Sequence, residues 1–155
     1  MENLSVFKKR LIIIVSIIVV AVLGSIFVNI GMDWYSTLNK PTQWVPDILI
    51  PIVWTIIYLA FAILLSIWIA KENISKTTII LLILNGIFNI LWCLVFFTLK
   101  QTLGGNVTII INLILSFLLI NEIKKANKLF ALILSIYPVW VCVATTLNNC
   151  IWILN

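Results

Sequence analysis

Five long apolar stretches, separated by short polar segments, dominate the sequence. They cover residues 11–30, 48–70, 77–99, 106–123 and 129–154. Each is about as long as the roughly 20 residues that an α-helix needs to cross about 30 Å of hydrocarbon. The pattern predicts an all-α integral membrane protein, in which residues 1–155 form a single domain built as a bundle of five transmembrane helices.

The first connection, residues 31–47, is the only long one, and it is rich in aromatic residues and proline. Such a segment can lie in the membrane interface or fold over the end of the bundle, and the sequence leaves both readings open. In the second reading the connection forms a lid over a site. The candidate lid residues are Trp34, Tyr35, Lys40, Pro41, Trp44 and Pro46.

Polar and aromatic side chains recur on one face of three predicted spans. At spacings of three or four residues, these faces contain Pro51, Trp54, Tyr58 and Ala62; then Asn85, Asn89, Trp92 and Phe96; then Tyr137, Trp140, Ala144 and Asn148. An asparagine amide facing lipid would leave donors and acceptors unpaired, so we expect the faces to point inward. The pattern predicts one shared ligand site beneath the first connection, formed by Trp54, Tyr58, Asn85, Asn89, Trp92, Tyr137, Trp140, Ala144 and Asn148.

Other polar and aromatic residues have simpler interpretations. Thr108, Asn112 and Ser116 on the fourth span could form a fourth wall of the site, but hydrogen bonds between helices are the favoured reading. Trp68 and Trp152 lie near span ends, where aromatic residues commonly anchor a helix at the membrane interface.

Composition and charge support the membrane assignment. The chain is 63% hydrophobic and 10% charged, with a mean hydropathy of +1.23, which excludes a soluble domain on a membrane tether. Its net charge of +5 does not indicate a nucleic-acid partner, because the basic residues gather in the amino-terminal segment and in short connections. With five crossings, eight basic residues lie on one side and two on the other. In a bacterial cell membrane this bias predicts a cytoplasmic amino terminus and an external carboxy terminus.

The sequence offers little for ordinary catalysis or metal binding. It contains no histidine, and none of its five acidic residues falls in the middle of a predicted span. The three cysteines lie within spans, where buried thiols without chemistry are the simplest interpretation. We therefore expect no metal site and no required cofactor, and the absence of a nucleotide-binding glycine loop excludes an intrinsic ATPase.

Four segments together resemble the TspO/MBR family, the bacterial relatives of the translocator protein, or peripheral-type benzodiazepine receptor. They are WYSTLNKP in the first connection, PIVWTIIY opening the second span, NGIFNILWCLVFF in the third and YPVWVCVATTLN in the fifth. The resemblance covers nearly the whole chain. One departure lies in KPTQWVP, where Gln43 stands in place of the usual tryptophan and Trp44 is shifted by one position.

The resemblance implies a five-helix bundle, often a homodimer, that binds porphyrins such as protoporphyrin IX and benzodiazepine-type ligands in an intramembrane pocket capped by the first connection. It assigns Trp54, Asn89, Trp92, Trp140, Ala144 and Asn148 to that pocket. A receptor for flat hydrophobic tetrapyrroles, acting in tetrapyrrole handling or a stress response, is the leading reading. The alternatives are a light-dependent porphyrin-degrading enzyme, with Trp92 and Trp140 as the participating indoles, and a passive transporter of tetrapyrroles or lipids.

Overall fold

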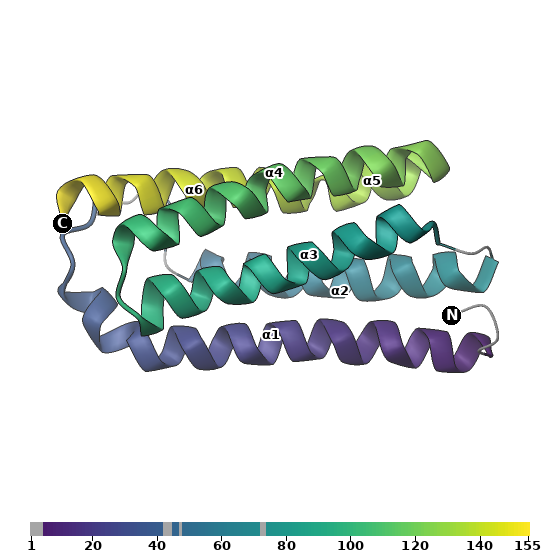
Figure 1. Ribbon diagram of the computed structural model, residues 1–155, viewed down its shortest axis with the longest axis horizontal. Coiled ribbons are helices and arrows are strands. Elements are labelled where there is room, and N and C mark those ends of the chain that lie inside the picture. The colour runs from purple at the N-terminus through teal and green to yellow at the C-terminus, as the bar shows by residue number, and fades with distance from the viewer. Residues whose placement is uncertain (1–4, 42–44, 47, 72–73) are drawn as a thin grey trace.

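The computed structural model describes residues 5–41, 45–46, 48–71 and 74–155, and the elements in them are all helical (Figure 1). In chain order they are α1 (Val6–Thr37), α2 (Leu49–Lys71), α3 (Lys76–Cys93), the π-helical segment η1 (Leu94–Thr98), α4 (Thr102–Ala126), α5 (Lys128–Leu134) and α6 (Ile136–Leu154). In the described part of the chain, α1, α2, α3 with η1, α4, and α5 with α6 are five spans long and apolar enough to cross a membrane. The predicted multi-pass bundle of five helices is confirmed.

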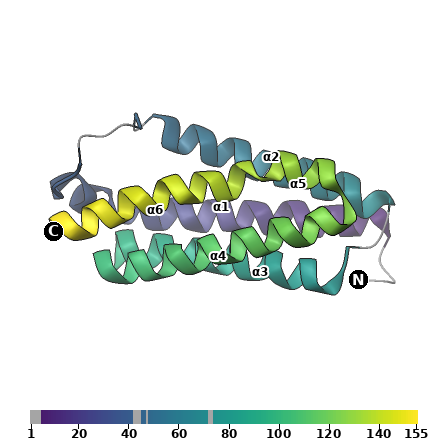
Figure 2. The ribbon, with the colours of Figure 1, turned by 90° about the horizontal axis from the view of Figure 1, so that it is seen from above.

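The spans form a ring. Going around it, α1 contacts α2, α2 contacts α5 and α6, α6 contacts α4, α4 contacts α3, and α3 returns to α1. Figures 1 and 2 together show α2 and α3 on opposite sides of α1, and the two helices make no direct backbone approach. The contact between α2 and α6 is among the sparsest in the ring. The backbones of α2 and α3, two of the three helices that carry the predicted polar and aromatic faces, are therefore separated across the middle of the bundle.

The first helix is longer than the sequence predicted. It continues to Thr37, so residues 31–37, expected in the first connection, form its last two turns. The extension packs: Trp34 meets Phe96 with ring centroids 5.7 Å apart, and Tyr35 meets Phe97 at 5.3 Å. Beyond α1, the backbone of Asn39 exchanges two hydrogen bonds of 2.9 Å with the Asn155 side chain. Tertiary packing of aromatic residues thus turns part of the expected loop into helix.

The third span changes its winding near its end. In η1 the N–H of Leu99 donates to the carbonyl of Leu94 at 2.9 Å, five residues back rather than four. This segment lies against Gly31 of α1 so closely that a Cβ added there would stand 2.1 Å from the Phe97 carbonyl oxygen. Gly31 therefore permits backbone contact between α1 and η1, which fixes Phe96 and Phe97 beside the end of α1.

The last span is broken at Ser135, between α5 and α6. The cause is Pro138, which has no N–H to donate to the carbonyl of Leu134 and whose ring crowds that carbonyl. The N–H of Ser135 still donates to Ala131 at 2.9 Å, so the chain turns without losing its helical course. All the stripe residues of the fifth span lie on α6, after the break.

The two ends of the bundle differ in charge. One end, here called the N-terminal end, holds the start of α1, the end of α2, the start of α3 and the junction of α4 with α5 (Figure 1). Eight basic residues belong to these segments: Lys8, Lys9, Arg10, Lys71, Lys76, Lys124, Lys125 and Lys128. Trp68, expected to anchor this end in the interface, is instead buried at 3% exposure against Phe130, whereas Trp152 at the opposite C-terminal end is 41% exposed.

Candidate functional site

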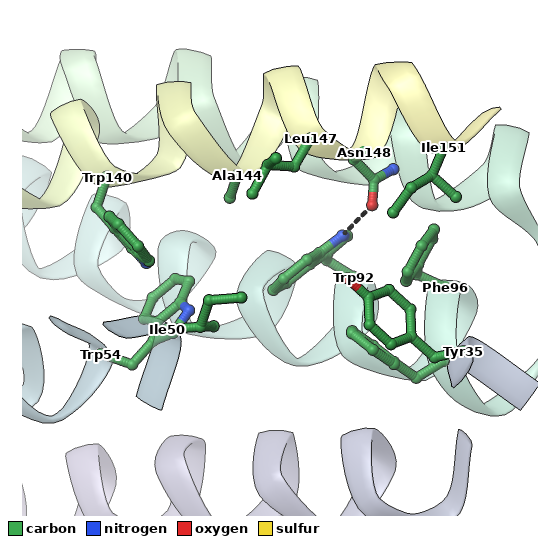
Figure 3. A pocket seen from close by; sticks show the side chains of 11 residues that line it. Tyr35, Ile50, Trp54, Trp92, Phe96, Trp140, Ala144, Leu147, Asn148 and Ile151 are labelled. Atoms are coloured by element: carbon green, nitrogen blue, oxygen red, sulfur yellow. Dashed lines mark hydrogen bonds between the residues drawn. The ribbon is translucent and has the colours of Figure 1, made fainter. Parts of the chain in front are cut away.

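A small cavity lies at the C-terminal end of the bundle, among α1, α2, α3, η1 and α6 (Figure 3). Its volume is about 60 Å³, and aromatic and aliphatic side chains form most of its walls. The lining residues are Tyr35, Ile50, Trp54, Trp92, Phe96, Phe97, Trp140, Ala144, Leu147, Asn148 and Ile151. We call this space the aromatic cavity.

Its aromatic walls are ordered by ring contacts that cross between helices. Trp54 of α2 and Trp92 of α3 stack with centroids 6.3 Å apart and an angle of 30° between their planes. Trp92 in turn stacks on Phe96 at 6.5 Å and 21°. These near-parallel rings bridge the gap that the α2 and α3 backbones leave, and they present flat faces, which suit an aromatic guest.

Hydrogen-bonding groups of the aromatic cavity are only partly satisfied. The indole Nε1 of Trp92 donates to Oδ1 of Asn148 at 3.3 Å, as Figure 3 shows. Within the described residues, Nε1 of Trp140 and Nδ2 of Asn148 have no hydrogen-bond partner although both are buried. Unpaired donors at membrane depth are costly, so these two N–H groups favour a guest that offers acceptors.

A second, larger cavity of about 660 Å³ lies mainly among α1, α2 and α3, toward the N-terminal end, with one lining residue each from α4 and α6. We call it the lateral cavity. Its walls are mostly aliphatic, and its polar groups gather where Tyr58 donates to Oδ1 of Asn89 at 3.1 Å. Nearby, Nδ2 of Asn85 donates to the carbonyls of Leu81, at 2.7 Å, and Leu115, at 3.2 Å. These bonds orient the two amides, while Nδ2 of Asn89 is left without a partner in the described part of the chain.

The nine residues predicted to share one site are divided between these two cavities. Trp92, Trp140, Ala144 and Asn148 line the aromatic cavity, and Tyr58, Asn85, Asn89 and Tyr137 line the lateral cavity. Trp54 lines both and marks the boundary between them. The structure thus distributes the nine residues over two cavities that meet at Trp54, because helical spacing gives the face of a residue but not the distance between α2 and α3.

The predicted lid residues have different positions. Tyr35 lines the aromatic cavity from α1 rather than from a loop, and Lys40 places its ammonium 4.0 Å from the centroid of the Tyr35 ring. Pro41 and Pro46 line neither cavity, and Trp44 lies outside the described residues. The described part of the first connection thus contacts the site mainly through Tyr35.

Some lining residues were missed by the sequence analysis. Leu147 and Ile151 follow Ala144 at three and seven positions on α6, so the same helical spacing could have found them, but their aliphatic side chains gave no chemical signal. Ile50 and Phe97 also lacked such a signal. Phe97 reaches the cavity next to Phe96 in η1, where the winding departs from the 3.6-residue period.

Thr108, Asn112 and Ser116 of the fourth span line neither cavity, and the expected hydrogen bonds between helices are found for Asn112 but not for Thr108 and Ser116. Asn112 accepts a 3.0 Å hydrogen bond from the hydroxyl of Tyr137, which joins α4 to α6. Thr108 and Ser116 donate to backbone carbonyls of their own helix. Among the described residues, no group of three or more histidine, cysteine, aspartate or glutamate side chains is placed to hold a metal ion.

Comparison with known proteins now identifies the family. The model of the TspO/MBR family matches residues 12–153, which cover most of every one of the five spans. The chain belongs to the TspO/MBR family. Its relatives include the tryptophan-rich protein TspO of Chlorobaculum tepidum, 32% identical over 85% of this chain and 86% of that protein, and the TspO of Archaeoglobus fulgidus, 32% identical over 92% and 94%. The protein CrtK of Rhodobacter capsulatus is 30% identical over 79% and 78%.

Membership of the TspO/MBR family agrees with the five-span architecture and with the tryptophan content of the chain, seven residues in 155. Three of these tryptophans, Trp54, Trp92 and Trp140, line the aromatic cavity.

Proposed function

We propose that this TspO/MBR protein is a membrane receptor for porphyrins and similar flat hydrophobic ligands, bound at the aromatic cavity. The observation that carries the proposal is the pair of buried donors without partners, Trp140 Nε1 and Asn148 Nδ2, beside three indole rings. A flat ligand with acceptor atoms matches both features. It offers a π-face to the rings and lone pairs to the two N–H groups.

The size of the cavity determines how such a ligand would be accommodated. At about 60 Å³ it is well below the roughly 300–1,000 Å³ of ordinary small-molecule pockets. Two features favour enlargement: the α2–α6 contact is sparse, and among the described residues Trp54 alone lines both cavities. Movement of α2 and of the Trp54 ring would join the aromatic cavity to the space beyond it and would expose the two donors to the ligand.

A porphyrin also has propionate groups, which need a polar exit. Lys40, just after α1, lies over the Tyr35 ring, and Tyr35 lines the aromatic cavity. An ammonium in this position can meet a propionate that extends from the C-terminal end of the bundle. Since Lys40 is only half-buried and stays near solvent, we expect this pairing to contribute little to affinity.

The proposal is tested by titrating protoporphyrin IX into the purified protein in detergent and following the porphyrin absorbance. Trp140→Phe keeps the ring but removes the donor, and should weaken binding about two- to tenfold, the range of one net hydrogen bond. Trp68→Phe is the matched control, because the Nε1 of Trp68 is also buried without a partner but packs against Phe130 far from the cavity. Equal affinity of wild type and Trp140→Phe, or an equal loss in the control, would refute the placement.

A further inference from the structure

The lateral cavity opens toward the lipid. Ile12, Val15 and Val19 of α1 and Ile83 and Ile87 of α3 line it and are also exposed on the surface of spanning helices. The cavity therefore communicates with the hydrocarbon part of the membrane through a side opening. Its volume of about 660 Å³ lies within the range of sites that hold a small molecule.

The lining chemistry favours a hydrocarbon chain over a charged molecule. No charged residue is among the described residues that line the cavity, and most of them are isoleucine, leucine, valine or phenylalanine. An apolar space of this size, open to a bilayer, is most favourably filled by lipid hydrocarbon, since leaving it empty forfeits dispersion contacts along all its walls. An acyl chain can enter sideways from the membrane.

Two basic residues stand at the N-terminal end of this cavity. Arg10 precedes the lining residues Ile13 and Ile17 by three and seven positions, so it lies on the same face of α1, about one turn beyond them. Its Nε donates to the carbonyl of Ser66 on α2 at 3.1 Å, next to the lining residue Leu65. The guanidinium is thus held where α1 and α2 meet, at the end of the cavity.

Lys76 provides the second cation from the other wall. It is the first residue of α3 and precedes the lining residue Ile79 by three positions, so it lies one turn beyond the cavity on the same face. Lys76 is exposed, and Arg10 uses only one of its five N–H donors in the bond to Ser66. One end of an apolar cavity is therefore flanked by a guanidinium and an ammonium from two helices.

We propose that the lateral cavity is a binding site for an anionic glycerophospholipid of the leaflet on the side of the N-terminus. One acyl chain occupies the cavity, and the phosphate meets Arg10 and Lys76. Arginine binds phosphate through paired N–H groups and lysine as a point charge, so the two residues complement this headgroup. A zwitterionic phospholipid brings its own cation near these side chains and binds less tightly, and a neutral diacylglycerol has only the chain contact.

The headgroup residues of this site, Arg10 and Lys76, do not line the aromatic cavity, and Trp54 is the lining residue that the two cavities share among the described residues. Binding is measured by native mass spectrometry of the detergent-purified protein with dioleoyl phosphatidylglycerol, dioleoyl phosphatidylcholine or dioleoylglycerol. We expect the anionic lipid to bind about tenfold more tightly than the other two, a difference typical of charge-assisted contacts. Equal affinity for the anionic and zwitterionic lipids would overturn the proposal.

Variants separate a built site from general attraction to a basic surface. Arg10→Gln combined with Lys76→Gln should lower affinity for the anionic lipid about tenfold, whereas Lys124→Gln combined with Lys128→Gln, which removes the same charge from the same end but not beside the cavity, should lower it by less than about twofold. Equal losses in both variants would overturn the proposal. Lys76→Gln alone leaves the Arg10–Ser66 hydrogen bond intact, and it should show part of the fall in anionic-lipid affinity seen in the double variant. A fall in this single variant could not be attributed to loss of the Arg10–Ser66 bond.

The chain contact needs its own test. Ser16 lines the lateral cavity from α1, and Ser16→Trp should fill part of it. This variant should lower the affinity for all three lipids. It should leave protoporphyrin affinity unchanged, because Ser16 does not line the aromatic cavity. Unchanged lipid binding in Ser16→Trp would show that only the headgroup is bound and would overturn the assignment of the cavity.

Discussion

The two cavities lie side by side in one bundle but differ in the kind of guest they suit. The aromatic cavity is small, lies among four spans and is walled by rings that contact one another across helices. The lateral cavity is about ten times larger, mostly aliphatic and open to lipid. The difference shows that stacked rings bridge α2 and α3 at the C-terminal end, whereas in the lateral cavity the hydrogen bond from Tyr58 to Asn89 joins the two helices and leaves more space between them.

The strongest way to break this contrast is to remove the residue that separates the cavities. Trp54→Ala should join them and lower the free energy of unfolding by about 3 kcal/mol, at the lower end for a large-to-small change because Trp54 is only partly buried. Thermal unfolding in detergent measures the loss. Trp152→Ala, which removes an exposed indole at the same end, is the control and should cost less. A Trp54→Ala variant as stable as wild type would mean that the ring does not hold the two spaces apart.

A second change tests the backbone contact that keeps the aromatic cavity closed. Gly31→Ala places a Cβ against the Phe97 carbonyl and should lower the free energy of unfolding by about 1–3 kcal/mol through overpacking. Gly24→Ala, on the same helix, meets only Sγ of Cys93 at 3.5 Å and should be tolerated. The comparison is made by thermal unfolding of both variants. Similar stability of the two would show that α1 and η1 are not held by this contact.

The smallest expected effect comes from a change in the lateral cavity, and it tests whether the two cavities bind different guests. Tyr58→Phe removes the hydroxyl that donates to Asn89 and should lower the free energy of unfolding by about 1 kcal/mol, the value of one net hydrogen bond. Protoporphyrin affinity should change by less than about twofold, because Tyr58 does not line the aromatic cavity. Denaturant unfolding and the porphyrin titration provide the two readings. A loss of porphyrin affinity as large as that of Trp140→Phe would place the flat ligand across both cavities.

Much of the fold could be predicted because a membrane leaves few options. Apolar stretches of about 20 residues must form helices there, and short connections make them neighbours. The stripes were also informative: the asparagines at 85, 89 and 148 are buried, as an amide in lipid should be. These expectations depend on the local period of a helix, which the sequence contains directly.

What the sequence could not provide depends on contacts between distant residues. The extension of α1 to Thr37 follows from packing of Trp34 and Tyr35 on Phe96 and Phe97, about 60 positions away. Trp68 was expected at the interface, but Phe130 of α5 covers it. The separation of α2 from α3, which divides one expected site into two cavities, likewise arises from how α1 lies between them.

The interruption at Ser135 has a mechanical consequence. Because Pro138 cannot donate to the carbonyl of Leu134, the last span lacks one backbone hydrogen bond there, so a bend between α5 and α6 costs least at Ser135. Trp140, Ala144 and Asn148 all lie on α6, so a bend at Ser135 would move them together. Such a bend would change the distance between these three residues and the opposite wall of the aromatic cavity, while their spacing from one another stays the same.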